Sequence, residues 1–408
     1  MTGASEPPAT GARRAGRWAR IVTLLALDRN TTAVVGAMFL MALGENLWRR
    51  FIPKYLEALG APVLAIGAYG SIEDLLDGLY QYPGGWVGDR QGSRRAMLLF
   101  VSLAAVGYAI VAAAPSWPVV LVGLVFVMCW TSMASPTLFA VIGDALPRER
   151  RAVGFSVQAI LRRLPILIAP ILGGLLILTH GVRDGVRVGL LVSITLAGAT
   201  LLVVRRMRVD VRPPAFTGIA GVWRSLPTPL RRLLLSDVFI RTCDGMVDVF
   251  LVLYAVNVIG IGAPAFGLLI AVQTATVIVC SLPAARLADR VGRKPFVVAT
   301  FVAFTCFPLA VVAAHSFTGL VLAYVIGGLR EIGEPARKAL ILEFVRPEVR
   351  ARGVGLYYLV RSLAIVPAAT VGGVLWTASP GLPFLVAGAI GLVGTVLFTL
   401  TVEERHAG

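Results

Sequence analysis

Charged side chains are scarce in this chain: aspartate, glutamate, lysine and arginine make up only 15% of its 408 residues. A soluble globular protein carries about 25% of them, and the mean hydropathy here is +0.82. Hydrophobic residues also do not alternate with polar ones, as they would in half-buried strands. The composition excludes an ordinary soluble domain and indicates an all-α polytopic membrane protein, because helices satisfy their own backbone groups in lipid.

Residues that carry redox, metal and covalent chemistry are few as well. The chain has three histidines, and its four cysteines lie scattered inside apolar runs without the spacing of metal ligands: Cys129, Cys243, Cys280 and Cys306. A disulfide framework and a zinc site are therefore not expected. The sequence also contains no GxxxxGK[ST] nucleotide-binding motif. We predict a protein that is not an enzyme, holds no cofactor or metal, and draws its energy from gradients.

Long apolar runs, by contrast, recur along nearly the whole chain. Each is close to the ~20 residues that cross ~30 Å of hydrocarbon. They predict twelve transmembrane helices, at residues 31–52, 63–87, 96–114, 118–142, 152–178, 187–204, 233–259, 265–287, 296–314, 318–343, 353–376 and 382–401. The predicted domains are a cytoplasmic segment 1–30, whose residues 18–28 fit a helix on the membrane surface, a first bundle 31–204, a linker 205–232, a second bundle 233–401 and a tail 402–408.

The net charge of +16 is confined to particular loops. Lysine and arginine collect before the first run and in alternate loops, at 90–95, 148–151, 205–232, 290–294 and 346–352. This is the positive-inside pattern, and it predicts that both termini are cytoplasmic in a cell membrane. Basic charge with this placement sets topology, so we expect no nucleic-acid partner.

One charged stretch occurs twice, about 200 residues apart. GGWVGDRQGSRR spans residues 84–95 and AARLADRVGRK spans 284–294, so that Asp89-Arg90 matches Asp289-Arg290 and Gly92 matches Gly292. Further pairs follow with a slip of one residue, among them Arg162 with Arg361 and Gly173-Gly174 with Gly372-Gly373. The chain thus reads as two parallel repeats of six helices, an arrangement that places a solute site near the midplane between the repeats.

These two stretches resemble the glycine-aspartate-arginine-glycine-basic motif that follows helices 2 and 8 in the major facilitator superfamily. Ser93 and Ala285 depart from it. The resemblance covers almost the whole chain and implies two six-helix bundles that work by alternating access. It also implies a gate whose arginines pair with an acid after helix 4 or helix 10. The gate residues would be Gly85, Gly88, Asp89, Arg90, Gly92, Arg94 and Asp144 in the first half, and Asp289, Arg290, Gly292, Arg293, Lys294 and Glu343 in the second. The alternative is that these charges only set topology.

We place seventeen charged residues well within the apolar runs, although each costs about 2.5–3.5 kcal/mol at the centre of a lone inserted helix. The acids are Glu45, Glu73, Asp74, Asp77, Asp244, Asp248, Glu331 and Glu334; the bases are Arg49, Arg50, Arg162, Arg163, Arg241, Arg330, Arg337, Lys338 and Arg361. Predicted helices 3, 6, 9 and 12 carry none, and those are the helices that face lipid in the resembled fold. The charges must therefore pair or face a central cavity.

Three roles for these charges compete. Most of them can form structural salt bridges between helices. Alternatively, Glu45, Asp77, Asp244 or Asp248 carries a coupling proton. The candidates for substrate binding are Arg49, Glu73, Asp74, Arg162, Arg241, Arg330, Glu334 and Arg361, since the planar guanidinium suits carboxylate or phosphate.

The sequence therefore predicts a monomeric secondary transporter in the lipid bilayer. It is expected to exchange protons for a small charged or zwitterionic organic solute. Export is slightly favoured, because Pro170 and Gly173-Gly174 are similar to the end of a motif of antiporters, although helix packing by small residues explains them equally well. The alternatives are a broad drug efflux pump, a metal-ion exporter and a membrane receptor or scaffold that transports nothing.

Overall fold

The computed structural model describes residues 29–134, 151–205, 227–344 and 350–402, and the regular structure in these ranges is entirely helical. The first half contains α2 (Arg29–Trp48), η1 (Arg49–Phe51), α3 (Ile52–Ala58), α4 (Val63–Gln91), α5 (Ser93–Ala113), α6 (Trp117–Met128), η2 (Cys129–Met133) and α8 (Arg151–Val204). The predicted all-α fold class is confirmed.

The second half contains α9 (Thr228–Val247), η5 (Asp248–Phe250), α10 (Leu251–Leu253), η6 (Tyr254–Val258), α11 (Ala263–Val291), α12 (Lys294–Ala313), α13 (Phe317–Leu329), α14 (Glu334–Phe344), α15 (Arg350–Ile365), α16 (Pro367–Ala378) and α17 (Leu382–Thr401). The described helices include six that are long and apolar enough to cross a membrane. Large apolar side chains such as Leu178, Val279 and Leu400 remain exposed, as lipid-facing residues do.

Helix boundaries differ from the predicted runs where glycine or proline changes the backbone. The runs 152–178 and 187–204 form α8, which is interrupted by the positive φ of 79° at Gly181. The run 353–376 is divided into α15 and α16 just before Pro367, whose missing N–H cannot continue the ladder. The run 318–343 is broken by a turn that begins at Arg330. The break at Gly181 falls in the predicted gap between two runs, whereas hydropathy alone does not show the breaks at Arg330 and Pro367, because both lie inside an apolar run.

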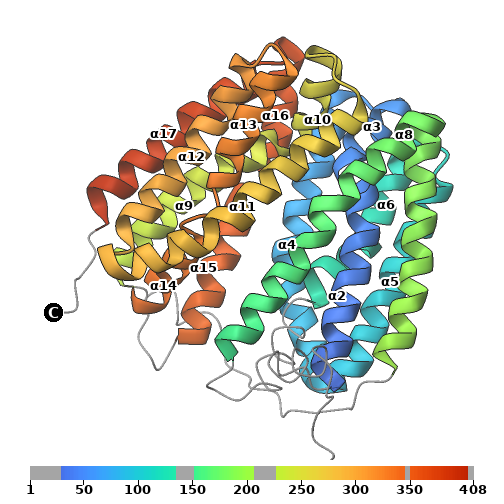
Figure 1. Cartoon of the computed structure of the whole chain (residues 1–408), viewed down its shortest axis with the longest axis horizontal. Helices are drawn as coiled ribbons and strands as arrows, with labels where there is room; N and C mark the ends of the chain where they lie inside the picture. The colour runs from blue at the N-terminus through green and yellow to red at the C-terminus, as the bar shows by residue number, and fades with distance from the viewer. Residues whose placement is uncertain (1–28, 135–150, 206–226, 345–349, 403–408) are drawn as a thin grey trace, which may run out of the picture.

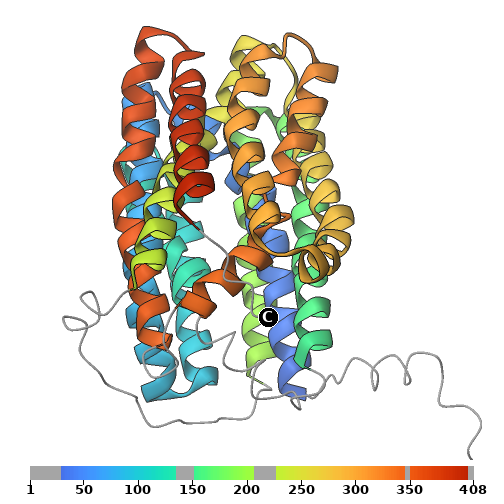
Figure 2. The ribbon, with the colours of Figure 1, turned by 90° about the vertical axis from the view of Figure 1, so that its left-hand side faces the viewer.

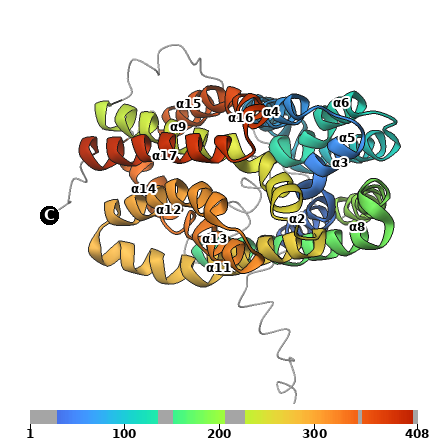
Figure 3. The same cartoon turned by 90° about the horizontal axis from the view of Figure 1, so that it is seen from above.

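The helices form two bundles that lie side by side (Figures 1 and 3). In the first bundle α8 packs against α2 and α5, and α6 packs against α5. In the second, α17 packs against α9 and α12, while α13 packs against α11 and α12. Figure 2 shows the helices of the second bundle running nearly parallel to one another. The two halves of the sequence are thus two separate bundles in space.

The bundles meet chiefly through two helix crossings, α4 with α16 and α8 with α11, and α4 also contacts α15. We call the end of the molecule at Gly92 and Gly292 the motif end, and the opposite end the far end. Toward the far end, small residues bring backbones together: a Cβ at Gly67 would lie 2.6 Å from the Ala369 carbonyl oxygen, and one at Gly174 would lie 2.6 Å from that of Ala263. In Figure 1 the ribbons of the two bundles converge at the far end and diverge toward the motif end.

Candidate functional site

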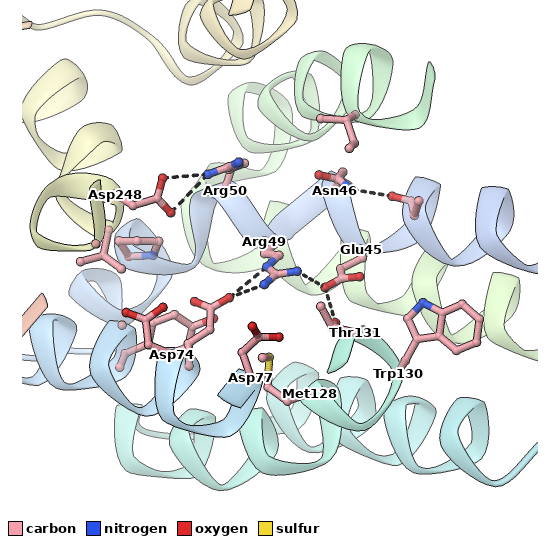
Figure 4. A pocket seen from close by; sticks show the side chains of 18 of the residues that line it. Glu45, Asn46, Arg49, Arg50, Asp74, Asp77, Met128, Trp130, Thr131 and Asp248 are labelled. Carbon is pink, nitrogen blue, oxygen red and sulfur yellow. Dashed lines mark hydrogen bonds and ion pairs between the residues drawn. The ribbon is translucent and has the colours of Figure 1, made fainter. Parts of the chain in front are cut away.

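A cavity of about 470 Å³ lies between the bundles. Most of its wall belongs to α2, η1, α4 and η2 of the first bundle, and α9 and η5 close it from the second. Its charged lining residues are five acids and two arginines: Glu45, Glu73, Asp74, Asp77, Asp248, Arg49 and Arg50. Apolar and aromatic side chains, including Met38, Tyr69, Met128 and Trp130, complete the wall. Seven of the seventeen predicted charges therefore converge on one space (Figure 4).

Arg49 is held between two carboxylates of the cavity wall. Its Nη1 donates to Glu45 Oε1 at 2.5 Å, one turn earlier on α2, and its Nε donates to Glu73 Oε1 on α4 at 3.1 Å. Thr131 Oγ1 of η2 also donates to Glu45, at 2.9 Å. This network joins four elements of the first bundle, α2, η1, α4 and η2, and engages all three guanidinium nitrogens, so Arg49 serves here as a counter-ion for acids.

Asp74 and Asp77 lie one turn apart on α4, and neither has a cationic partner among the described residues. Asp77 accepts a hydrogen bond from Ser132 Oγ at 2.6 Å and a longer one from Gln81 at 3.5 Å. Asp74 has no hydrogen bond or ion pair within the described part of the chain, and its Oδ2 would lie 3.4 Å from a Cβ at Gly245 of α9. Asp74 is therefore the carboxyl group of the cavity that is left for a ligand or a proton.

At the far end, polar contacts tie the bundles directly to each other. Arg50 Nη1 donates to both carboxylate oxygens of Asp248, at 3.1 and 3.3 Å. Lys54 donates to the Asn257 side-chain oxygen at 2.6 Å, and the Asn257 amide donates to Glu57 at 2.8 Å. We call these contacts the far-end latch. Glu57 and Asn257 lie 200 positions apart, the repeat offset of the sequence, so the latch joins equivalent points of the two halves.

A second charge network fills the interior of the second bundle. Arg330 binds Asp244, donates to the Gly327 carbonyl at 3.0 Å and lies over the Phe307 ring at 4.2 Å. Arg241 lies farther from its acids, 3.4 Å from Glu334 and 3.9 Å from Asp244. Glu334 also pairs with Arg337 at 2.6 Å. Within the described chain, the acids of this network are all matched by arginines.

Asp237 belongs to this network although sequence reasoning missed it. It is almost fully buried, pairs with Arg337 and Arg361, and accepts a hydrogen bond from the Tyr357 hydroxyl at 2.9 Å. The distance to Arg361 is 3.4 Å. The sequence did contain a signal for Asp237. It precedes Arg241 by four residues, so the two side chains lie on the same face of α9, one turn apart.

The motif end holds the duplicated stretches at equivalent turns. Gly92 has a φ of 80° and Gly292 a φ of 109°, values that side chains other than glycine rarely adopt. Arg90 lies over the Trp86 ring at 5.1 Å, and Arg293 Nη1 lies 2.9 Å from Glu343 Oε2. Lys294 donates to the Thr399 carbonyl at 3.0 Å.

Several predicted site residues lie outside what the structure describes. Asp144 lies outside the described ranges, as do the side chains of Asp89, Asp289 and Arg162. Their predicted roles therefore stay predictions. Within the described residues, no group of three or more histidine, cysteine, aspartate or glutamate side chains has the arrangement of a metal site.

Comparison with known proteins identifies the family to which this fold belongs. The family model described as Major Facilitator Superfamily matches residues 34–256 and again 233–408, once for each half. The chain belongs to the major facilitator superfamily. It is thus an integral membrane transporter, and the predicted family and its fold are confirmed. The second match begins at residue 233, close to the start of the second bundle, while the first extends to residue 256 and so includes α9.

Individual relatives are distant. The chain is 20% identical to an uncharacterized MFS-type transporter of Methanocaldococcus jannaschii over 91% of its own length and 94% of the relative. It is 24% identical to the quinolone resistance protein NorA of Staphylococcus aureus, over 36% of this chain and 38% of NorA. The match thus spans well under half of NorA.

Solved structures share the fold at low identity. A mutant of the nucleoside transporter NupG superimposes with a TM-score of 0.76 at 13% identity, over 91% of this chain and 100% of that one. A POT family transporter in complex with 5-aminolevulinic acid gives a TM-score of 0.75 at 13% identity, over 93% and 98% of the two chains. At such identity the likeness establishes the fold alone.

Proposed function

We propose that this protein exchanges protons for a small organic solute that carries a positive charge. The observation that carries the proposal is the charge of the cavity: five acids and two arginines line it, a formal surplus of three negative charges. Both arginines are already engaged, Arg49 with Glu45 and Glu73, and Arg50 with Asp248. A cation is the ligand that this wall accommodates at the lowest electrostatic cost.

Asp74 supplies the exchange step in this proposal. A carboxylate without a partner is costly at membrane depth, so a bound proton or a bound cation stabilises it. Because one carboxyl group cannot hold both, binding of the solute releases the proton and protonation releases the solute. Alternation of the two ligands at Asp74 then couples solute movement to the proton gradient.

Alternating access follows from the way the bundles meet. The far end is closed by the two helix crossings and the far-end latch, and the bundles diverge at the motif end. With the basic loops on the cytoplasmic side, the motif end faces the cytoplasm of the cell and the cavity belongs to an inward-facing state. Rocking of the bundles about the cavity opens the far end and closes the motif end. We propose export as the direction.

The drug-efflux alternative draws on the same cavity. Trp130, Tyr69, Met38 and Met128 give it an apolar and polarizable wall beside the acids, which suits cations with flat apolar bodies. The partial match to NorA supports this variant. A broad efflux pump would accept many such cations with similar affinity, whereas a dedicated transporter would select one.

The test is solute-driven proton movement in proteoliposomes loaded with a pH-sensitive dye. Vesicles acidic inside would be given tetraphenylphosphonium, or a quinolone with a basic amine, and the lumen should become alkaline as protons leave. Asp74→Asn should reduce this signal to that of protein-free vesicles, because amide nitrogen carries no exchangeable acidic proton. Asp184→Asn is the matched control, since Asp184 is 68% exposed and lies outside the cavity. Normal proton outflow in Asp74→Asn would exclude Asp74 as the exchange site.

A further inference from the structure

The charge network of the second bundle has the opposite sign to the cavity. Its bases are Arg241, Arg330, Arg337, Lys338 and Arg361, and its acids are Asp237, Asp244 and Glu334, so five positive charges face three negative ones. The cavity wall, mostly from the first bundle, carries five acids against two arginines. A net negative cavity wall therefore lies beside a net positive network inside the second bundle, although the arginines of that network are not part of the cavity wall itself.

Two arginines of the positive network are incompletely used. The Nε atoms of Arg241 and Arg361 are buried and have no hydrogen-bond partner. The closest ion-pair distance of each residue is 3.4 Å, longer than the ~2.7–2.9 Å of a good charge-assisted hydrogen bond. Arg337, by comparison, binds Asp237 and Glu334 closely. Arg241 and Arg361 thus keep donors that can turn to an anionic group, and their side chains are 26% and 17% exposed.

Helix crossings bring these arginines near the unpaired acid. Asp74 faces Gly245, and Arg241 precedes Gly245 by four residues on α9, a rise of about 6 Å along the helix. One turn beyond Asp74, a Cβ at Gly78 would lie 2.9 Å from the Ser362 side chain, and Ser362 follows Arg361 directly on α15. The acid of α4 and the arginines of α9 and α15 are therefore within the span of one small molecule.

From this arrangement we propose that the solute is a zwitterion bound in one orientation. Its positive group pairs with Asp74 on the first bundle, and its carboxylate or other anionic group pairs with Arg241 and Arg361 on the second. The inference rests on the proposed transport of a cationic solute and adds the second charge. Each half then holds one end of the solute, so separation of the halves weakens binding on the side that opens. The rival arrangement is a direct ion pair between Asp74 or Asp77 and these arginines when the motif end closes.

The test compares matched ligands on the purified full-length protein by thermal unfolding. One series is 5-aminolevulinic acid, its methyl ester and its N-acetyl derivative. The other is a quinolone with a basic amine and a free carboxylate, its ethyl ester and its N-acetyl derivative. In the series that binds, each blocked form should bind about tenfold or more weakly than the zwitterion, because each loses one charge-assisted contact.

The outcomes separate this inference from the proposed function. Equal binding of the ester and the zwitterion would overturn the anion site and leave cation exchange intact. Equal binding of the N-acetyl form would overturn the cation site and with it the proposed function. Absence of binding by all six compounds would overturn this inference, and the proposed function falls as well if tetraphenylphosphonium also drives no proton outflow.

Variants locate the anion site. Arg361→Lys keeps a positive charge beside Asp237 but loses the guanidinium fork. The advantage of the zwitterion over its ester should shrink in this variant and in Arg241→Lys, while unliganded stability stays near that of the parent protein. Lys338→Gln is the control, because Lys338 is 58% exposed and, among the described residues, pairs with Glu334 alone at 3.5 Å. An undiminished preference for the zwitterion in both arginine variants would exclude these residues as its anion site.

Discussion

At the scale of single residues, Asp237 is the most deeply buried charge of the structure's described part. It is 1% exposed and lies against two arginines, Arg337 and Arg361, so it neutralises positive charge in the interior of the second bundle. Removal of one member of a buried ion pair leaves the other uncompensated, which costs far more than the pair itself contributes. Asp237 is therefore expected to matter for stability rather than for selectivity.

We predict that Asp237→Asn lowers the free energy of unfolding by about 3–5 kcal/mol. Unfolding in detergent, followed by tryptophan fluorescence, measures the change. Glu331→Gln serves as the control, because the Glu331 side chain is 50% exposed and its pair with Arg163 should contribute little. A stability loss as small as that of Glu331→Gln would show that the arginines find other partners.

The sequence predicted which residues of the site are charged but not how they pair. Glu45 and Arg49 were expected on one helix face, and the structure joins them at 2.5 Å. Glu73 binds Arg49, whereas the neighbouring Asp74 has no partner among the described residues. Which of the two acids is paired depends on how α2 is rotated against α4. Such rotation is set by packing between helices and leaves no periodic trace in one sequence.

At the scale of elements, glycines decide where the bundles meet. Gly67 contacts Ala369 on α16, and Gly267, its equivalent 200 positions later, contacts Pro170 on α8. The prediction that Gly173-Gly174 and Gly372-Gly373 are repeats was made from the sequence. It could not show that Gly174 and Gly373 face helices of the other half while Gly173 and Gly372 face α2 and α9 of their own bundles, because a small residue packs equally well in either place.

Gly267→Leu should hold the far ends of the bundles apart, because a Cβ already meets the Pro170 backbone. Spin labels at Pro62→Cys and Gly262→Cys would report the distance between the far ends by pulsed electron resonance. We expect a longer distance in Gly267→Leu than in the parent protein. Gly198→Leu is the matched control, since Gly198 has open space around its Cβ position. An unchanged distance would mean that α8 and α11 adjust without opening the far end.

At the scale of the whole molecule, the duplicated sequence produces two bundles with equivalent glycine turns at the motif end and equivalent glycine contacts toward the far end. The repeat could be recognised in the sequence because charged residues and glycines recur at a fixed offset. The predicted limits of the two bundles were derived from that repeat. Hydropathy did not show the turn after α13 or the short elements between α9 and α11, since all of these lie within apolar runs. The positions of such breaks are determined by tertiary packing around the cavity, where helices must bend to bring side chains inward.

The motif end provides the last prediction, which separates a gate from a topology signal. Arg293 at the start of α12 forms an ion pair with Glu343 at the end of α14. In the proposed alternation, α14 and the motif end of α15 approach the first bundle when this end closes. Arg293→Ala and Arg94→Ala should therefore slow transport several-fold while ligand affinity, measured by thermal shift in the same preparations, stays unchanged. The reason is that the cavity lies away from these residues, so the loss falls on the conformational step alone. Lys338→Ala controls for the loss of one basic residue. Normal transport rates in both variants, with normal abundance, would mean that the repeated charges only orient the chain in the membrane.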